Sequence, residues 1–409
     1  MLLLALAYGG SAAANLLLSV VVGRRLGAAA LGHFALAVAV ARVCYAASDF
    51  GITTHLTRLI ARDRARAGVE TSRFLTVRAA IVPVAMAIAA AVAHDQGASM
   101  AIVFALVALA LGLVTIQNIY EAALLAVAQR RLVASLNAGS AAAIMTACAA
   151  WWLAGQHLVG FAAGYAAAAL LGVAVWAHHG RAHLALALRL RIDLRSTARA
   201  LQTCWPIGAS TVLAIAALRA PVLALGAFAR PGDVGTFVAI DTFVTAAGIL
   251  QVAVTNTSFA RLAASFRTDR AAFRALLWRS NAVLAAIGVA TALVITLWGD
   301  RLAAALFSGR DFDRVRDIAP IIAWSAPALL IVHHNIYVFA AADSERRNLE
   351  IMLVWFAALT GAQLVLVPAY GIVGAAWGLL IGRLVGLGAL IVMLLRFAGH
   401  AQVPARPRG

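Results

Sequence analysis

Residues 99–126 read SMAIVFALVALALGLVTIQNIYEAALLA, and Glu121 is the only charged residue among them. A helix of about 20 apolar residues spans the hydrocarbon core of a bilayer. Comparable stretches recur along the whole chain of 409 residues, which is 64% hydrophobic. Soluble domains seldom exceed about 50% apolar residues. The sequence therefore predicts a polytopic membrane protein without a separate soluble domain.

Each span has to satisfy its own backbone hydrogen bonds in lipid, whereas an outer-membrane barrel would show short alternating strands. We therefore predict an all-α polytopic membrane protein with about twelve transmembrane helices. The expected spans are 1–23, 34–56, 74–93, 99–126, 133–154, 157–178, 203–227, 234–259, 276–298, 317–341, 350–368 and 372–396.

The charge of the chain is strongly positive, at +17, and all 33 basic residues are arginine. Without lysine, a Walker A phosphate loop and a lysine Schiff base are excluded. The arginines lie mainly between the spans, where cytoplasmic orientation and anionic membrane lipids explain them better than nucleic acid does. The three cysteines show no metal-binding spacing. We expect no metal, no cofactor and no nucleic-acid partner.

Arginine content alternates between successive loops. The loops 57–73, 127–132, 179–202 and 260–275 are rich in arginine, whereas 94–97, 155–157 and 369–371 have none. The positive-inside rule then places both termini in the cytoplasm, with an even number of spans. Arg24 and Arg25 disagree with this rule, because they fall on the outer side.

An internal repeat divides the chain. LGHFA at residues 31–35 resembles VGTFV at residues 234–238, which lies 203 positions later. VGFAAG at residues 159–164 resembles VGAAWG at residues 373–378, which lies 214 positions later. We predict two lobes of six helices, residues 1–190 and 191–409. Since each lobe has an even number of spans, the pseudo-symmetry axis runs along the membrane normal, and a site is expected where the lobes meet.

Short motifs follow one another in a fixed order over nearly the whole chain. They are GRRLG at 23–27, LGHFA at 31–35, DFG at 49–51, LTRLIA at 56–61, WPI at 205–207, DVGTF at 233–237 and PAYGIVGAA at 368–376. Their order and spacing resemble those of the polysaccharide, or lipid-linked oligosaccharide, flippases of the multidrug/oligosaccharidyl-lipid/polysaccharide exporter superfamily.

This resemblance implies two lobes around a central cavity, a bacterial inner-membrane location and no enzymatic activity. It also implies the cargo, an undecaprenyl-pyrophosphate-linked oligosaccharide that is flipped from the inner to the outer leaflet. We expect a monomer that works beside a glycan polymerase. Many members carry Asp-Arg in the seventh helix where this chain reads Leu218-Arg219, so the arginine is kept and its acidic neighbour is not.

Three arginines, Arg42, Arg219 and Arg383, lie well inside predicted spans. A charge there costs about 2.5–3.5 kcal/mol on insertion scales. A guanidinium binds phosphate oxygens bidentately, so Arg42 and Arg219 are predicted to form a cationic site for the pyrophosphate. Arg383 either joins that site or packs the lobes. Arg24 and Arg25 either ring the outer mouth or extend toward the lipid headgroups.

The acidic residues Asp241 and Glu121 lie inside spans, and Asp49 lies nearer the cytoplasmic end of one. An intramembrane acid is a candidate for proton or sodium coupling, and the alternative is hydrogen bonding between helices.

Two other classes of protein stay open. A multidrug/cation antiporter of the same superfamily would carry an acid in its first helix, and residues 1–23 have none. A membrane glycan polymerase would need a large outer loop with catalytic groups. The longest outer loop, 299–316, is short but contains Asp300, Asp311 and Asp313.

Overall fold

The computed structural model describes residues 2–154, 157–184, 194–307, 312, 314–341 and 345–399. The first half contains α1 (Leu2–Asp49), α2 (Ile52–Arg62), α3 (Ala67–Val92), α4 (Ala98–Ala126), α5 (Arg130–Ala154) and α6 (Leu158–Leu184). The second half contains α7 (Leu194–Phe228), α8 (Pro231–Ala246), α9 (Gly248–Thr268), α10 (Arg270–Phe307), α11 (Val315–Ala323), α12 (Ala326–Ala341) and α13 (Glu345–Gly399). The described residues form no strand, so the predicted all-α fold is confirmed.

Nine described helical stretches are long and apolar enough to cross a membrane, and the bent pair α11 and α12 makes a tenth. Two of the nine, Leu16–Arg62 and Arg347–Leu395, are 47 and 49 residues long, and in each of them a helix is broken at an internal glycine. The breaks lie at Gly27, with φ 83°, and at Gly371, with φ 57°. Glycine adopts positive φ readily because it has no Cβ. Dividing both stretches at these glycines gives the twelve predicted spans.

The helix breaks at Gly27 and Gly371 have counterparts in the other lobe, at the positions to which the internal repeat assigns them. The position 203 residues after Gly27 is Arg230, which lies in the break between α7 and α8. The position 214 residues before Gly371 is His157, which lies between α5 and α6. Both lobes therefore turn the chain at corresponding points, as the repeat predicted.

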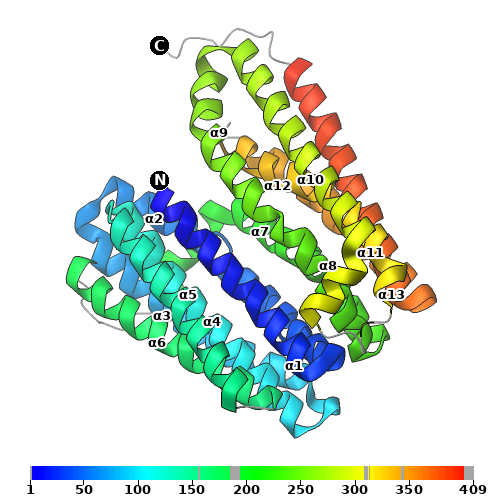
Figure 1. Cartoon of the computed structure of the whole chain (residues 1–409). Coiled ribbons are helices and arrows are strands. Elements are labelled where there is room, and N and C mark those ends of the chain that lie inside the picture. Colours follow the sequence, from blue (N-terminus) through cyan, green and yellow to red (C-terminus); the bar gives the residue numbers. More distant parts are fainter. Residues whose placement is uncertain are drawn as a thin grey trace.

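The helices form two bundles (Figure 1). In the first, α4 packs against α3 and α6, and α5 packs against α1 and α6. In the second, α13 packs against α7, α11 and α12, and α10 packs against α9, α11 and α12. The predicted boundary between the lobes, at residues 190 and 191, lies outside the described residues. The start of α1 and the end of α13 lie on the same side of the molecule (Figure 1), as an even number of spans requires.

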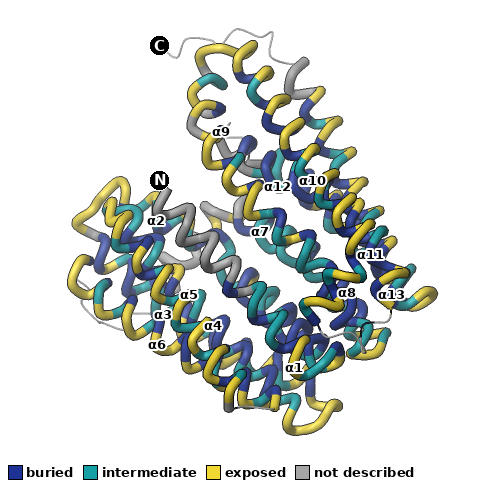
Figure 2. The backbone as a smooth tube through the Cα atoms, in the orientation of Figure 1, coloured by how far each residue is buried: buried dark blue, intermediate teal, exposed yellow. Residues whose placement is uncertain are grey.

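Exposed apolar side chains cover the outer faces of both bundles. Leu171 on α6, Leu297 on α10 and Val365 on α13 are each more than half exposed. Figure 2 shows exposed residues along the outer helices and buried residues where helices face one another. Such side chains are stable against lipid tails, so these faces are the membrane-facing surface.

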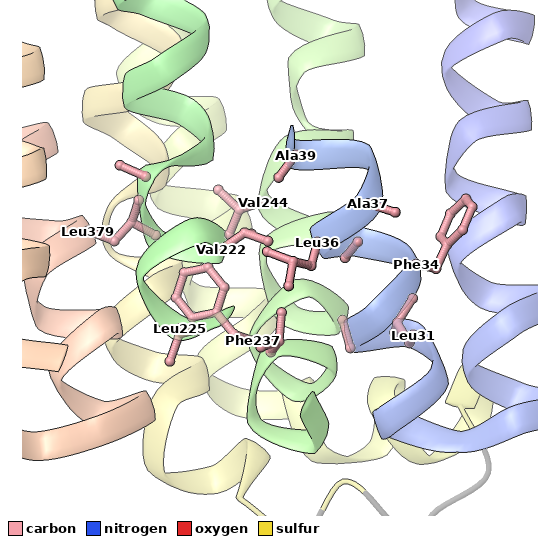
Figure 3. Close-up of a cluster of buried hydrophobic side chains, with 14 of the residues drawn as sticks. Leu31, Phe34, Leu36, Ala37, Ala39, Val222, Leu225, Phe237, Val244 and Leu379 are labelled. Carbon is pink, nitrogen blue, oxygen red and sulfur yellow. The ribbon is translucent and has the colours of Figure 1, made fainter. Parts of the chain in front are cut away.

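The lobes contact each other through α1, which packs against α7 and α8. Leu36 of α1 points toward Val222 of α7 and Phe237 of α8 (Figure 3). A Cβ placed on Gly226 of α7 would lie 2.5 Å from Leu36 Cδ1. Glycine on one helix therefore makes room for a leucine of the other lobe.

The closest approach of the lobes is made by two glycines of the repeat. A Cβ on Gly32 would lie 1.9 Å from the carbonyl oxygen of Pro231, and a Cβ on Gly235 would lie 1.8 Å from that of Ala28. Ala28 corresponds to Pro231 and Gly32 corresponds to Gly235, each 203 positions apart. The contact is thus reciprocal, as at a two-fold axis. The pseudo-symmetry axis passes between α1 and α8 at this point.

Adding a methyl group at this contact should loosen it. We expect Gly32→Ala and Gly235→Ala each to lower the apparent melting temperature of the protein in detergent, because the new Cβ meets backbone that has to move, and overpacking costs about 1–3 kcal/mol. Gly139→Ala in α5 is the matched control, since nothing lies within 4 Å of the added Cβ. Equal melting temperatures for Gly32→Ala and wild type would show that the lobes are not this close.

Candidate functional site

A cavity of about 340 Å³ lies between the lobes. Its lining from the first lobe consists of Leu16, Leu18, Ser19, Phe34, Ala35, Val38, Arg42, Leu111 and Tyr165. Its lining from the second lobe consists of Arg219, Val222, Val238, Asp241, Thr242, Thr245, Ala246 and Ile249. The site expected where the lobes meet is therefore present as a cavity shared by both halves of the repeat.

Arg42 and Arg219 bring two positive charges into this cavity from opposite lobes. Arg42 lies on α1 and Arg219 on α7, and both are half-buried. The Nε atom of each is buried without a hydrogen-bond partner, and neither forms an ion pair within the described residues. Arg219 lies within electrostatic range of Arg42 and of Asp241. The cavity therefore holds two guanidinium groups that no carboxylate neutralises directly.

Arg383 does not line the cavity but supports one of its walls. Its side chain is 2% exposed, and its Nη2 donates to Asp241 Oδ1 at 3.1 Å. Its Nη1 donates to Ser325 Oγ at 2.6 Å, at the break between α11 and α12. The structure thus places Arg383 against helices of its own lobe, with Asp241 between it and the cavity.

A second chamber of about 190 Å³ shares Arg42 and Leu111 with the first cavity. Its other lining residues are Tyr45, Ala46, Asp49, Thr53, Arg78, Val114, Thr115, Asn118, Thr211 and Ile215. Hydroxyl, amide and charged groups predominate in this set. The chamber extends the cavity toward α2, near the C-terminal end of α1 at Asp49.

Arg78 of α3 is a buried arginine that we did not predict from the sequence. Its side chain is 4% exposed and pairs with Asp49 of α1. It also donates to Ser48 Oγ at 2.8 Å and to the carbonyl oxygen of Tyr45 at 3.3 Å. The signal was available, because Arg78 lies inside the predicted span 74–93 just as Arg42 lies inside its own.

Arg24 and Arg25 lie outside both chambers, just before the break at Gly27 within α1. Arg24 donates to the carbonyl oxygen of Ala305 at 3.3 Å, in the last turn of α10. Arg25 donates to that of Trp152 at 2.9 Å, in the last turn of α5, and stacks over the Trp152 ring at 4.1 Å. A cation is favourable at a helix C-terminus. Their contact with a cargo at the outer mouth stays a prediction.

The three predicted coupling acids have different surroundings. Asp49 and Asp241 line the chambers and are paired with arginines. Glu121 faces α5, where it accepts a hydrogen bond from Asn137 Nδ2 at 3.3 Å. Their role in ion coupling stays a prediction. Within the described residues, no group of three His, Cys, Asp or Glu side chains could hold a metal ion. Asp311 and Asp313 of the 299–316 loop lie outside the described residues.

The chain is thus a two-lobed helical membrane protein with a cavity between its lobes. Residues 1–266 match the family described as polysaccharide biosynthesis protein, and the chain belongs to that family. A search of curated proteins gave no match.

Solved structures show the same fold at low sequence identity. The lipid II flippase MurJ in an inward closed conformation is 10% identical, with a TM-score of 0.72 over 97% of this chain and 88% of that one. An inward-facing multidrug resistance MATE family transporter of the MOP superfamily is 13% identical, with a TM-score of 0.71 over 97% and 96%. A MOP superfamily transporter from Pyrococcus furiosus, described by the reverse polarity of its binding pocket, is 13% identical, with a TM-score of 0.69 over 98% and 96%.

The charge of the cavity can be measured with thiol reagents. In a chain without native cysteines, we expect Thr245→Cys, an exposed position in the cavity wall, to react with a sulfonate-bearing methanethiosulfonate. The measured quantity is the ratio of the reaction rate with the anionic reagent to that with a cationic one. This ratio should be higher for the Thr245→Cys variant than for a free thiol in solution, because Arg42 and Arg219 attract anions.

The buried neighbour Val244, which is 0% exposed, provides the control position as Val244→Cys. The preference for the anionic reagent should fall when Arg42 and Arg219 are both replaced by alanine. An unchanged preference in that variant would contradict the assignment of the cavity charge to these two residues.

Proposed function

We propose that this protein is a flippase that moves a polyprenyl-pyrophosphate-linked oligosaccharide from the inner to the outer leaflet, by alternating access, during polysaccharide biosynthesis. The observation that carries the proposal is the pair Arg42 and Arg219. One comes from each lobe, both face one cavity, and neither is neutralised by a carboxylate of its own.

The charge balance of the cavity favours an anionic cargo. Asp241 is paired with Arg383, so Arg42 and Arg219 remain as surplus positive charges. Two guanidinium forks suit a diphosphate, which offers several oxygens to bidentate donors. A cationic drug would be repelled by the same field, so the cavity gives the antiporter alternative less support.

The apolar part of the lining suits the lipid portion of such a cargo. Leu16, Leu18, Val38 and Ile249 line the same cavity as the two arginines. Apolar contacts of this kind are favourable for a polyprenyl chain that leaves water. A structural neighbour described as a lipid II flippase adds support for a lipid-linked cargo.

The proposal also includes the setting in which the protein works. The exposed arginines at the end of α2, Arg58, Arg62 and Arg64, suit a cytoplasmic membrane surface. We place both termini in the cytoplasm, the protein in the bacterial inner membrane as a monomer, and a glycan polymerase downstream of it.

Removing either free arginine should weaken binding of the cargo. We expect Arg42→Ala and Arg219→Ala each to reduce the affinity for undecaprenyl pyrophosphate in lipid nanodiscs by about tenfold or more, because a charge-assisted hydrogen bond contributes about 1.5–3 kcal/mol. Surface glycan in a flippase-deficient strain should fall in parallel. Arg130→Ala, at an exposed position outside both chambers, serves as the control. Normal binding and normal surface glycan in both variants would falsify the proposed function.

A further inference from the structure

The two lobes contain the same arrangement of charges around the cavity. In the first lobe, Arg78 is buried and pairs with Asp49 at the chamber wall, with side-chain exposures of 4% and 23%. In the second lobe, Arg383 is buried and pairs with Asp241, with exposures of 2% and 23%. Each lobe then contributes one further arginine to the cavity, Arg42 or Arg219. Thus each lobe has a buried arginine, a carboxylate at the wall and a free arginine.

Each buried arginine has a serine as its second partner. Arg78 Nη1 donates to Ser48 Oγ at 2.8 Å, and Arg383 Nη1 donates to Ser325 Oγ at 2.6 Å. Each guanidinium thus binds two groups at once, a serine hydroxyl and a carboxylate. This fork geometry fixes the position of the carboxylate as well as its charge.

The arrangement is not a simple consequence of the sequence repeat. The position 203 residues after Arg78 is Asn281, which pairs with Asn335 instead of an acid. The two buried arginines come from helices that do not correspond, α3 in one lobe and α13 in the other. The same combination of charges is therefore built in two ways, which indicates that the combination itself matters.

We propose that Arg78 and Arg383 are positioning residues that hold Asp49 and Asp241 away from the free arginines, so that Arg42 and Arg219 stay available to the anionic group of the cargo. The inference rests on the proposed function. Without Arg383, the carboxylate of Asp241 would be left without its partner in the cavity that Arg219 also lines, and Asp241 lies within electrostatic range of Arg219. An internal carboxylate would then compete with the phosphate.

The first lobe should show the same effect in weaker form. Asp49 lies two helical turns from Arg42 on α1, which is about 10 Å along the axis. Both residues line the smaller chamber. A free Asp49 would therefore act on Arg42 mainly through the electric field of the chamber, not through a direct ion pair. We therefore expect the loss of Arg383 to weaken cargo binding more than the loss of Arg78.

Replacing the partner carboxylate as well as the buried arginine distinguishes a positioning role from a merely structural one, because only a positioning role predicts that cargo binding is restored. The probe is undecaprenyl pyrophosphate, bound to the purified protein in lipid nanodiscs. We expect Arg383→Gln to weaken binding by about tenfold, equivalent to about 1.4 kcal/mol. The double variant Arg383→Gln/Asp241→Asn should restore binding to within about threefold of wild type, because the competing carboxylate is gone. Arg78→Gln should show a smaller loss, and Asp49→Asn should restore it.

Asp241→Asn alone tests the inference even where Arg383→Gln fails to fold. Asparagine has nearly the same size as aspartate, so the packing around Arg383 is kept. The charge of Arg383 is then no longer compensated, the cavity becomes more positive, and binding of the probe should tighten several-fold. If Asp241 itself bound the cargo, the same variant would bind more weakly, which would overturn the inference. Arg316→Gln is the matched control, because Arg316 pairs with Asp300 at the exposed surface away from both chambers.

The outcomes also separate this inference from the proposed function. If Arg42→Ala and Arg219→Ala bind the probe normally, the proposed function is wrong. If those variants bind weakly while Arg383→Gln binds normally, only the positioning role is wrong. A double variant that stays as weak as Arg383→Gln, with a wild-type melting temperature, also rejects the positioning role.

Discussion

A guanidinium inside a bilayer has to find a partner, and this constraint organises the structure. A buried charge without one is costly, whereas a paired or ligated charge is tolerated. Arg78 and Arg383 meet the constraint with carboxylates. Arg42 and Arg219 instead face a cavity. The two charges without an internal partner among the described residues are thus those that line the cavity, where the proposed cargo would bind.

The backbone packing of the lobes brings these charges into one cavity. Gly32 and Gly235 allow the main chains of α1 and α8 to touch, which brings α1 of one lobe within reach of the other lobe. Arg42 follows Gly32 on α1, and Asp241 follows Gly235 on α8. The reciprocal contact therefore sets the distance between the charged walls. A larger residue at either glycine would separate the helices that line the cavity.

The sequence predicted the twelve spans and singled out Arg42 and Arg219 as arginines inside them, because a bilayer makes composition informative. A long apolar stretch has few alternatives to a transmembrane helix, and an arginine within it stands out. Arg78 also lies inside a predicted span, but its burial comes from its contacts with α1, which the sequence of that span does not show. The ion pairs were not predictable, since Asp241 and Arg383 are 142 positions apart in the chain. Such pairing depends on helix packing, which no local pattern encodes.

The division of the charges between lobes connects binding with conformational change. A ligand shifts an equilibrium only through its different affinity for the two states. Arg42 and Arg219 belong to separate lobes and line one cavity, so a bound diphosphate would contact both only while the lobes hold them together. In the absence of cargo, the two positive charges repel each other across the cavity, and the anion removes this repulsion. Under the proposed function, cargo binding would therefore favour the arrangement in which both lobes enclose the anion. In the proposed flippase, separation of the two arginines would weaken the site and so provide the differential affinity that release into the opposite leaflet requires.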